Sequence, residues 1–200
     1  MKNYIKALSR DDLSQWLVHF CKSLTFNGQQ LNPFESLKSI LNCNRIFASK
    51  MEAIIKYEPN GASCFYDIPP QNWWELINTN PNNRRGYGII VSKSAFWFKG
   101  GRPCIYTENP STISWPPDQK YRLIFTDLLR QPFPVDWTHE REWRVVGDFT
   151  FDPIPNQGYW WWPCVEKVVD CQVLYREFQN IDFVYVMELN RVLRRTEIFY

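Results

Sequence analysis

Residues 16–49, WLVHFCKSLTFNGQQLNPFESLKSILNCNRIFAS, predict a strand, a helix and a second strand in succession. The run at residues 16–22 is short and apolar, which is typical of a buried strand. Asn32 can cap a helix that Pro33 opens, and Glu35 can complete a capping box. Apolar residues then recur at helical spacing, so we expect a helix that ends near residues 42–44, before the second strand.

The rest of the chain consists of short apolar runs separated by proline and glycine turns. Short strands outnumber helices, and the two do not alternate regularly. This favours an α+β fold of mixed sheets with a few short helices over a doubly wound parallel sheet. Strands are predicted at residues 16–22, 45–49, 62–66, 87–92, 103–107, 143–146, 165–175 and 183–187.

Two further helices are expected after proline residues. Pro70 can open a short helix through Trp73, Trp74 and Ile77. Pro116-Pro117 precedes a helical stripe of apolar residues. The members of that stripe are Tyr121, Ile124, Phe125, Leu128 and Leu129.

Composition indicates one folded domain over residues 1–200. A chain of 200 residues is shorter than the length at which domains split, roughly 250–300 residues. Its 44% hydrophobic content and 22% charged content exclude intrinsic disorder, and 17% of its residues are aromatic. A net charge of +2 gives no broad electrostatic footprint for nucleic acid.

Targeting and metal signals are missing from the sequence. The N-terminal residues have no apolar core of a secretory signal, and every apolar run is shorter than the ~20 residues of a membrane helix. We therefore expect a cytoplasmic protein with no membrane association, whose six cysteines are reduced. With two histidines and no C-x-x-C pair, no metal site is expected.

The polar cluster Glu140-Arg141-Glu142-Trp143-Arg144 is the best candidate for chemistry. If it is extended, Glu140, Glu142 and Arg144 share one face. Two carboxylates beside an arginine suit a cationic, sugar-like transition state. The alternative is a strand end with exposed ion pairs, such as Glu140 with Arg144, each worth ~0–1 kcal/mol.

Several segments occur in an order that matches a known family. Residues 18–23, 37–41 and 46–49 are similar to the opening of ADP-ribosyltransferase-like folds. The later segments are Cys64-Phe65-Tyr66-Asp67-Ile68-Pro69, residues 86–93, residues 101–106 and Glu140-Arg141-Glu142-Trp143-Arg144. Over residues 16–146 this set resembles the AbiGi-type abortive-infection (phage-resistance) proteins of bacteria and, more distantly, the DarT-type toxins that ADP-ribosylate DNA. Residues 147–200 would be C-terminal strands of the same domain.

The resemblance implies a site for NAD as substrate. His19 would hold the ribose, or is a core histidine. Ser49 would face the nicotinamide, or is a turn serine. Tyr66 would stack on the nicotinamide, or packs in the core. Arg144 would bind a phosphate of NAD, or pairs with Glu140.

The same resemblance assigns the two glutamates. Glu142 would be the catalytic residue, because a carboxylate on the ribose 2′-hydroxyl stabilises the oxocarbenium-like state formed when nicotinamide leaves. Glu140 would orient the acceptor, as the first glutamate of an E-x-E arrangement. His19 and both glutamates are then expected in one cleft.

Two classes of function follow from this resemblance. The first is an anti-phage or toxin enzyme that cleaves NAD and transfers ADP-ribose to a nucleic acid or a protein. The second is a non-catalytic antitoxin-like or phage-sensing protein on the same fold, whose partner is a toxin or a phage protein.

The three consecutive tryptophans Trp160, Trp161 and Trp162 offer a third hypothesis. Prolines flank them, which favours a loop over a central strand. Such a loop would present at least one exposed indole to a protein partner or to the bases of a nucleic acid.

Overall fold

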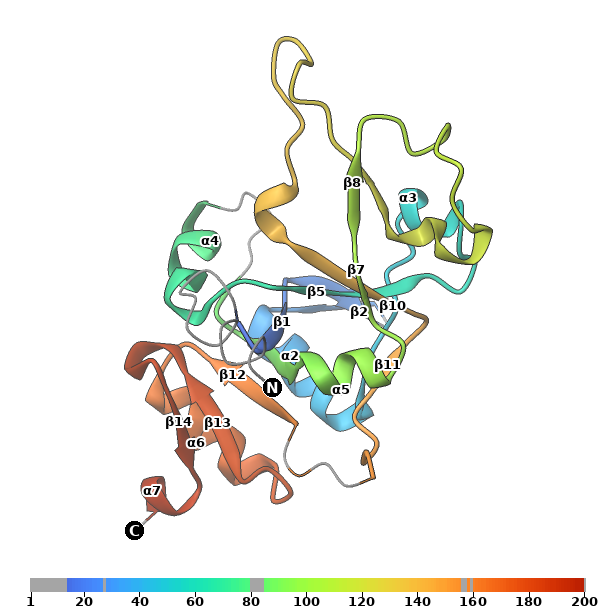
Figure 1. Cartoon of the computed structure of the whole chain (residues 1–200). Coiled ribbons are helices and arrows are strands. Elements are labelled where there is room, and N and C mark those ends of the chain that lie inside the picture. The colour runs from blue at the N-terminus through green and yellow to red at the C-terminus, as the bar shows by residue number, and fades with distance from the viewer. Residues whose placement is uncertain (1–13, 27, 80–84, 156–157, 159, 200) are drawn as a thin grey trace, which may run out of the picture.

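A computed structural model of the chain describes residues 14–26, 28–79, 85–155, 158 and 160–199 (Figure 1). Within them, eight strands form one large mixed sheet in the order β14-β13-β12-β6-β1-β5-β10-β7. Strands β12 and β13 run parallel, and the other neighbouring pairs of this sheet are antiparallel. The expected mixed sheet with short helices is confirmed.

The large sheet draws its strands from the whole described chain. They are β1 (Trp16–Phe20), β5 (Ala62–Tyr66), β6 (Gly88–Ser92), β7 (Arg102–Pro103), β10 (Glu142–Val146), β12 (Trp161–Val165), β13 (Phe183–Val186) and β14 (Arg191–Arg194). Three small sheets pair β2 (Leu24–Phe26) with β3 (Gln29–Leu31), β4 (Arg45–Ile46) with β11 (Phe149–Thr150), and β8 (Ile105–Thr107) with β9 (Leu123–Phe125).

The helices are short. The α-helices are α2 (Pro33–Cys43), α3 (Glu52–Ile55), α4 (Trp73–Thr79), α5 (Lys93–Phe98), α6 (Val168–Glu177) and α7 (Thr196–Phe199). The 3₁₀ turns of the described residues are η1 (Pro70–Asn72), η2 (Pro117–Arg122), η3 (Thr138–Glu140) and η4 (Met187–Leu189). None of the helices in the described part of the chain combines the length and the apolar character of a membrane span.

The large sheet is covered on both faces. Helices α2, α5 and α6 pack on the first face, where Leu37, Phe96 and Leu174 join the largest core cluster. Helix α4 packs on the second face through Trp73 and Ile77. The middle of the sheet is therefore apolar on both faces.

Helix α2 forms where the sequence predicts it, because its start is specified locally. The Asn32 side chain accepts a hydrogen bond from the Glu35 amide at 3.0 Å. The Glu35 carboxylate accepts one from the Asn32 amide at 2.8 Å. Asn44 ends the helix in the left-handed conformation, with φ of 52°. The predicted strands at residues 16–22 and 62–66 and the helix through Trp73 are also present.

The helix predicted after Pro116-Pro117 is wrong. Residues 117–122 form the 3₁₀ turn η2, and Leu123 then begins strand β9. Strand β9 pairs in parallel with β8, so tertiary pairing replaces the local helical pattern. Leu128 and Leu129 are exposed rather than part of a buried stripe.

The strand predicted at residues 165–175 is also wrong over most of its length. Strand β12 ends at Val165, and helix α6 follows, with the Lys167 amide donating to the Asp170 carboxylate at 3.2 Å. Helix α5 was not predicted. The sequence of α5 follows strand β6 directly, with no turn residue between them. The Ser92 hydroxyl caps helix α5 by accepting a hydrogen bond from the Ala95 amide at 3.2 Å.

The three consecutive tryptophans do not form an exposed loop. Trp161 and Trp162 lie in strand β12, opposite Val91 and Ile90 of β6. Trp160 is buried, and the other two indoles are half-buried. The Trp161 ring packs 4.6 Å from Phe151, and the Trp162 ring 4.1 Å from Trp16. The expected loop is wrong, because Trp161 and Trp162 belong to strand β12, and these two indoles are half-buried rather than fully exposed.

Candidate functional site

Strand β10 places Glu142 and Arg144 on one face of the sheet, as the two-residue repeat of a strand requires. Glu142 lies opposite Tyr66 of β5, and Arg144 lies opposite Cys64. Only 8% of Glu142 and 7% of Arg144 is exposed. The pair is therefore internal, and the alternative of exposed ion pairs at a strand end is wrong.

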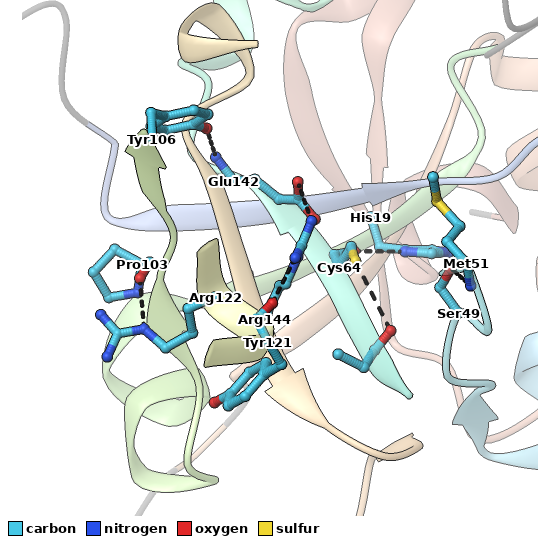
Figure 2. A network of polar contacts seen from close by, with 11 residues as sticks. His19, Ser49, Met51, Cys64, Pro103, Tyr106, Tyr121, Arg122, Glu142 and Arg144 are labelled. Carbon is cyan, nitrogen blue, oxygen red and sulfur yellow. Dashed lines mark hydrogen bonds and ion pairs between the residues drawn. The ribbon is translucent and has the colours of Figure 1, made fainter. Parts of the chain in front are cut away.

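Arg144 binds Glu142 through two hydrogen bonds (Figure 2). Its Nε donates to Oε1 at 2.9 Å, and its Nη2 donates to Oε2 at 3.2 Å. Its Nη1 donates to the carbonyl oxygen of Tyr121 at 2.5 Å. Burial alone would lower the pKa of Arg144, but the Glu142 carboxylate raises it above its ordinary value. Arg144 thus pairs with Glu142 and not with Glu140.

A tyrosine and two thiols surround this ion pair. The Tyr106 hydroxyl accepts a hydrogen bond from the Glu142 amide at 2.8 Å. Burial raises the pKa of the Cys64 and Cys104 thiols and of the Tyr106 hydroxyl above their ordinary values. Since a thiol attacks as its thiolate, neither cysteine is poised as a nucleophile at neutral pH.

Glu140 lies next to this network but outside the strand. It is buried at the end of the turn η3, and Arg141 follows in the left-handed conformation with φ of 45°. Burial is the main cause that raises the pKa of the Tyr106 hydroxyl, and the charges of Glu142 and Glu140 raise it further. Both carboxylates therefore lie near that hydroxyl. The expected extended backbone over residues 140–144 is wrong at its first two residues, because the turn ends just before β10 begins.

A second polar cluster, which the sequence reasoning missed, centres on Asp67. Lys93 Nζ lies 2.7 Å and Arg141 Nη2 3.5 Å from the same oxygen, Asp67 Oδ2. The other oxygen, Oδ1, is buried without a hydrogen-bond partner. Both Asp67 and Lys93 fall inside segments that the family resemblance includes, so a search for charged residues at strand ends could have found them.

His19 lies on the opposite face of the sheet from Glu142. Val18, Tyr66 and Glu142 lie side by side on β1, β5 and β10, so these three residues share one face. His19 follows Val18 and points the other way. Its ring packs 5.6 Å from Phe65, and its Nδ1 lies 2.9 Å from the Cys64 carbonyl oxygen. Figure 2 shows the ring on the side of Cys64 away from Glu142.

Ser49 and Tyr66 lie at opposite ends of β5. Ser49 pairs with Ala62 at the start of that strand, and its hydroxyl accepts from the Met51 amide at 3.4 Å. Tyr66 ends the strand, about 13 Å further along at 3.3 Å per residue. The Tyr66 ring stacks 6.4 Å from Phe20. The structure therefore gathers Tyr66, Glu142 and Arg144 and leaves Ser49 and His19 elsewhere.

Comparison of the chain with protein-family models, with curated proteins and with solved structures finds no match. In the part of the chain that the structure describes, no three side chains of His, Cys, Asp or Glu gather as metal ligands would. The geometry of the two polar clusters is thus the basis for a functional proposal.

Proposed function

We propose that the protein is a non-catalytic binding protein of bacterial anti-phage defence, acting in the cytoplasm on a toxin or a phage protein. We also propose that its mixed sheet is an ADP-ribosyltransferase-like fold. The order of the motifs that resemble AbiGi-type proteins supports both proposals, and so does the large mixed sheet.

The observation that carries this proposal is the engagement of Glu142 by Arg144. A carboxylate that stabilises an oxocarbenium-like sugar must turn an uncompensated negative charge toward that sugar. Both oxygens of Glu142 are instead bound by a guanidinium in a buried setting. Breaking such a pair leaves a buried charge unpaired, which costs about 3–5 kcal/mol.

The positions of the other residues assigned to NAD support the same conclusion. His19 and Glu142 belong to opposite faces of the sheet, and Ser49 lies at the far end of β5 from Tyr66. One dinucleotide would need these side chains within hydrogen-bond reach of a common ligand. A binding protein on this fold needs no such convergence.

A second candidate function, ADP-ribosyl transfer from NAD, is favoured by one observation. Glu140 is a buried carboxylate two residues before Glu142, and its charge is among those that raise the pKa of Tyr106. Left-handed backbone at a residue other than glycine, here Arg141, is a form of strain that often occurs at active sites. In this reaction the nicotinamide–ribose bond breaks, nicotinamide leaves with the bonding electrons, and the acceptor forms the new bond to the ribose.

Incubation of the purified chain with NAD separates the two candidates. A binding protein releases no nicotinamide above the level of a protein-free control, and its effect in a phage-challenge assay survives Glu140→Gln. Nicotinamide release that Glu140→Gln abolishes would establish the enzyme instead. Circular dichroism of the variant shows whether a loss of function reflects a loss of folding.

A further inference from the structure

Helix α5 carries two exposed aromatic side chains. Trp97 is 51% exposed and Phe98 is 67% exposed, although the same helix buries Ala95 and Phe96 in the core. The Trp97 ring lies 6.3 Å from Trp143 of β10, edge to face. Exposed aromatic rings of this size are costly in water and are typical of binding surfaces.

Arg102 lies directly against this aromatic surface. Its guanidinium carbon is 3.8 Å from the centre of the Trp97 ring. Its Nη1 donates to the carbonyl oxygens of Trp97 at 3.0 Å and of Gly101 at 2.7 Å. Among the described residues no carboxylate lies within ion-pair distance of Arg102, so its positive charge is held in place by neutral groups and is not neutralised.

Lys93, one helical turn before Trp97, adds a second cation next to Trp143. Its Nζ lies 5.9 Å from the centre of the Trp143 ring and 2.7 Å from Asp67 Oδ2. An ammonium has three donors, and Lys93 is partly exposed, so it can take a further carboxylate while it keeps Asp67. We name this set, Lys93, Trp97, Phe98, Arg102 and Trp143, the α5 patch.

We infer that the α5 patch binds a short acidic segment of a partner protein. Acidic side chains of the segment pair with Arg102 and Lys93, and apolar side chains between them pack on Trp97 and Phe98. Charge complementarity carries this choice, because a cation lies at each end of the row of rings formed by Trp143 and Trp97. Tryptophan and arginine are also the residues most enriched among those that dominate interface energies.

A nucleic acid fits this surface less well. Nucleic-acid binding draws most of its free energy from neutralising several phosphates. The patch offers two cations, one of which already binds Asp67, in a chain whose net charge is +2. An acidic peptide needs few ion pairs and gains the rest of its affinity from the exposed rings. This inference rests on the proposed binding function and adds the chemistry of the partner.

Selection from a library of short random displayed peptides tests the inference on the full chain. We expect the enriched peptides to carry an excess of Asp and Glu alternating with apolar residues. Labelled copies of them should bind about tenfold more weakly to Trp97→Ala and to Arg102→Ala. Their affinity should also fall as salt is raised.

Matched controls keep the test specific. Trp74→Ala removes an exposed tryptophan from α4 on the other face of the sheet and should leave binding unchanged. Arg102→Lys keeps the positive charge but removes the planar guanidinium that stacks on the Trp97 ring. Thermal unfolding shows whether each variant is folded. Absence of enrichment, enrichment without acidic residues, or binding unaffected by both patch variants would overturn the inference.

A labelled oligothymidine provides the competing arm. If it binds more tightly than the selected peptides and depends on Trp97, the patch is a nucleic-acid surface and the inference is wrong. Nicotinamide release from NAD is measured in a separate assay. A negative result for peptide binding to the α5 patch can therefore be distinguished from a failure of the proposed binding function.

Discussion

Arg144 holds both carboxylate oxygens of Glu142, its neighbour two residues earlier on the same strand, at 2.9 and 3.2 Å. Neighbouring ion pairs on a strand are usually solvated, but here both residues are buried and the Tyr121 carbonyl oxygen accepts a further hydrogen bond from Arg144. The pair is therefore a structural element of the sheet, and its removal should be felt in stability.

Glu142→Gln should lower the free energy of unfolding by about 3 kcal/mol, because it leaves a buried guanidinium without its counter-ion. If the pair were exposed, the loss would be only ~0–1 kcal/mol. Urea unfolding measures the change. Glu177→Gln is the matched control, since Glu177 pairs with Lys38 at 3.1 Å on the surface and should change stability by less than about 1 kcal/mol. Equal effects of the two substitutions would contradict the buried-pair interpretation.

Lys93→Met should destabilise the fold by about 2–4 kcal/mol, because the buried Asp67 then keeps only the longer contact to Arg141. Adding Asp67→Asn should recover part of the loss, since it removes the unpaired charge. A double-mutant cycle in urea measures this coupling. Strictly additive effects would show that the 2.7 Å contact between Lys93 and Asp67 does not stabilise the fold.

Asn32→Ala should cost about 1 kcal/mol, because it removes the side-chain acceptor that caps helix α2. Glu35 would lose its reciprocal role in the same capping box. Thermal unfolding measures the change. Asn42→Ala lies within the same helix at an exposed position and should be neutral or slightly stabilising, because alanine is the better helix former. A loss at Asn42 as large as that at Asn32 would argue against the cap.

Stability should fall as pH rises above about 8.5. Burial raises the pKa of Cys171 to about 12, and it also raises the pKa of Cys21, Cys64 and Cys164. In the unfolded chain these thiols ionise near their ordinary pKa, whereas the folded chain keeps them protonated. The unfolded state therefore binds fewer protons, and the free energy of unfolding decreases with pH.

The stabilisation from these thiols is fully present below their ordinary pKa and is lost as pH rises toward the folded values. Urea unfolding in the presence of a reductant, at several pH values from neutral to about 10, measures the slope. A flat profile over that range would mean that the thiols are not buried as the structure places them.

Local sequence signals predicted the helices and strands whose formation depends on residues close to them in the chain. The capping residues Asn32 and Glu35 and the opening Pro33 specify helix α2 without help from the rest of the chain. Strand β5 was also predicted, because its short apolar run is bounded by turn residues. The placement of Glu142 and Arg144 on one face follows from strand alternation alone, although the partner expected for Arg144 was Glu140.

Long-range pairing decided the elements that the sequence reasoning missed. The stripe that begins at Tyr121 has helical spacing, yet Leu123–Phe125 pairs with β8 from a segment nearly twenty residues earlier. The tryptophans at 160–162 look like a loop beside prolines, yet β12 pairs with β6. A short window of sequence does not contain the partner strand. A prediction from that window therefore uses local propensity alone and leaves out the energy of the strand pairing.

The mixed α+β class, the start of helix α2 and the shared face of Glu142 and Arg144 all follow from the order of the residues in the chain. Three other features depend on how the strands pair: the burial of Glu142 and Arg144, the position of His19 on the opposite face, and the contacts of Asp67 with Lys93 and Arg141. The physical reason is register: the row Val18, Tyr66 and Glu142 is set by hydrogen bonds between strands far apart in the chain. Since each residue along a strand changes face, that register decides which side chains can meet.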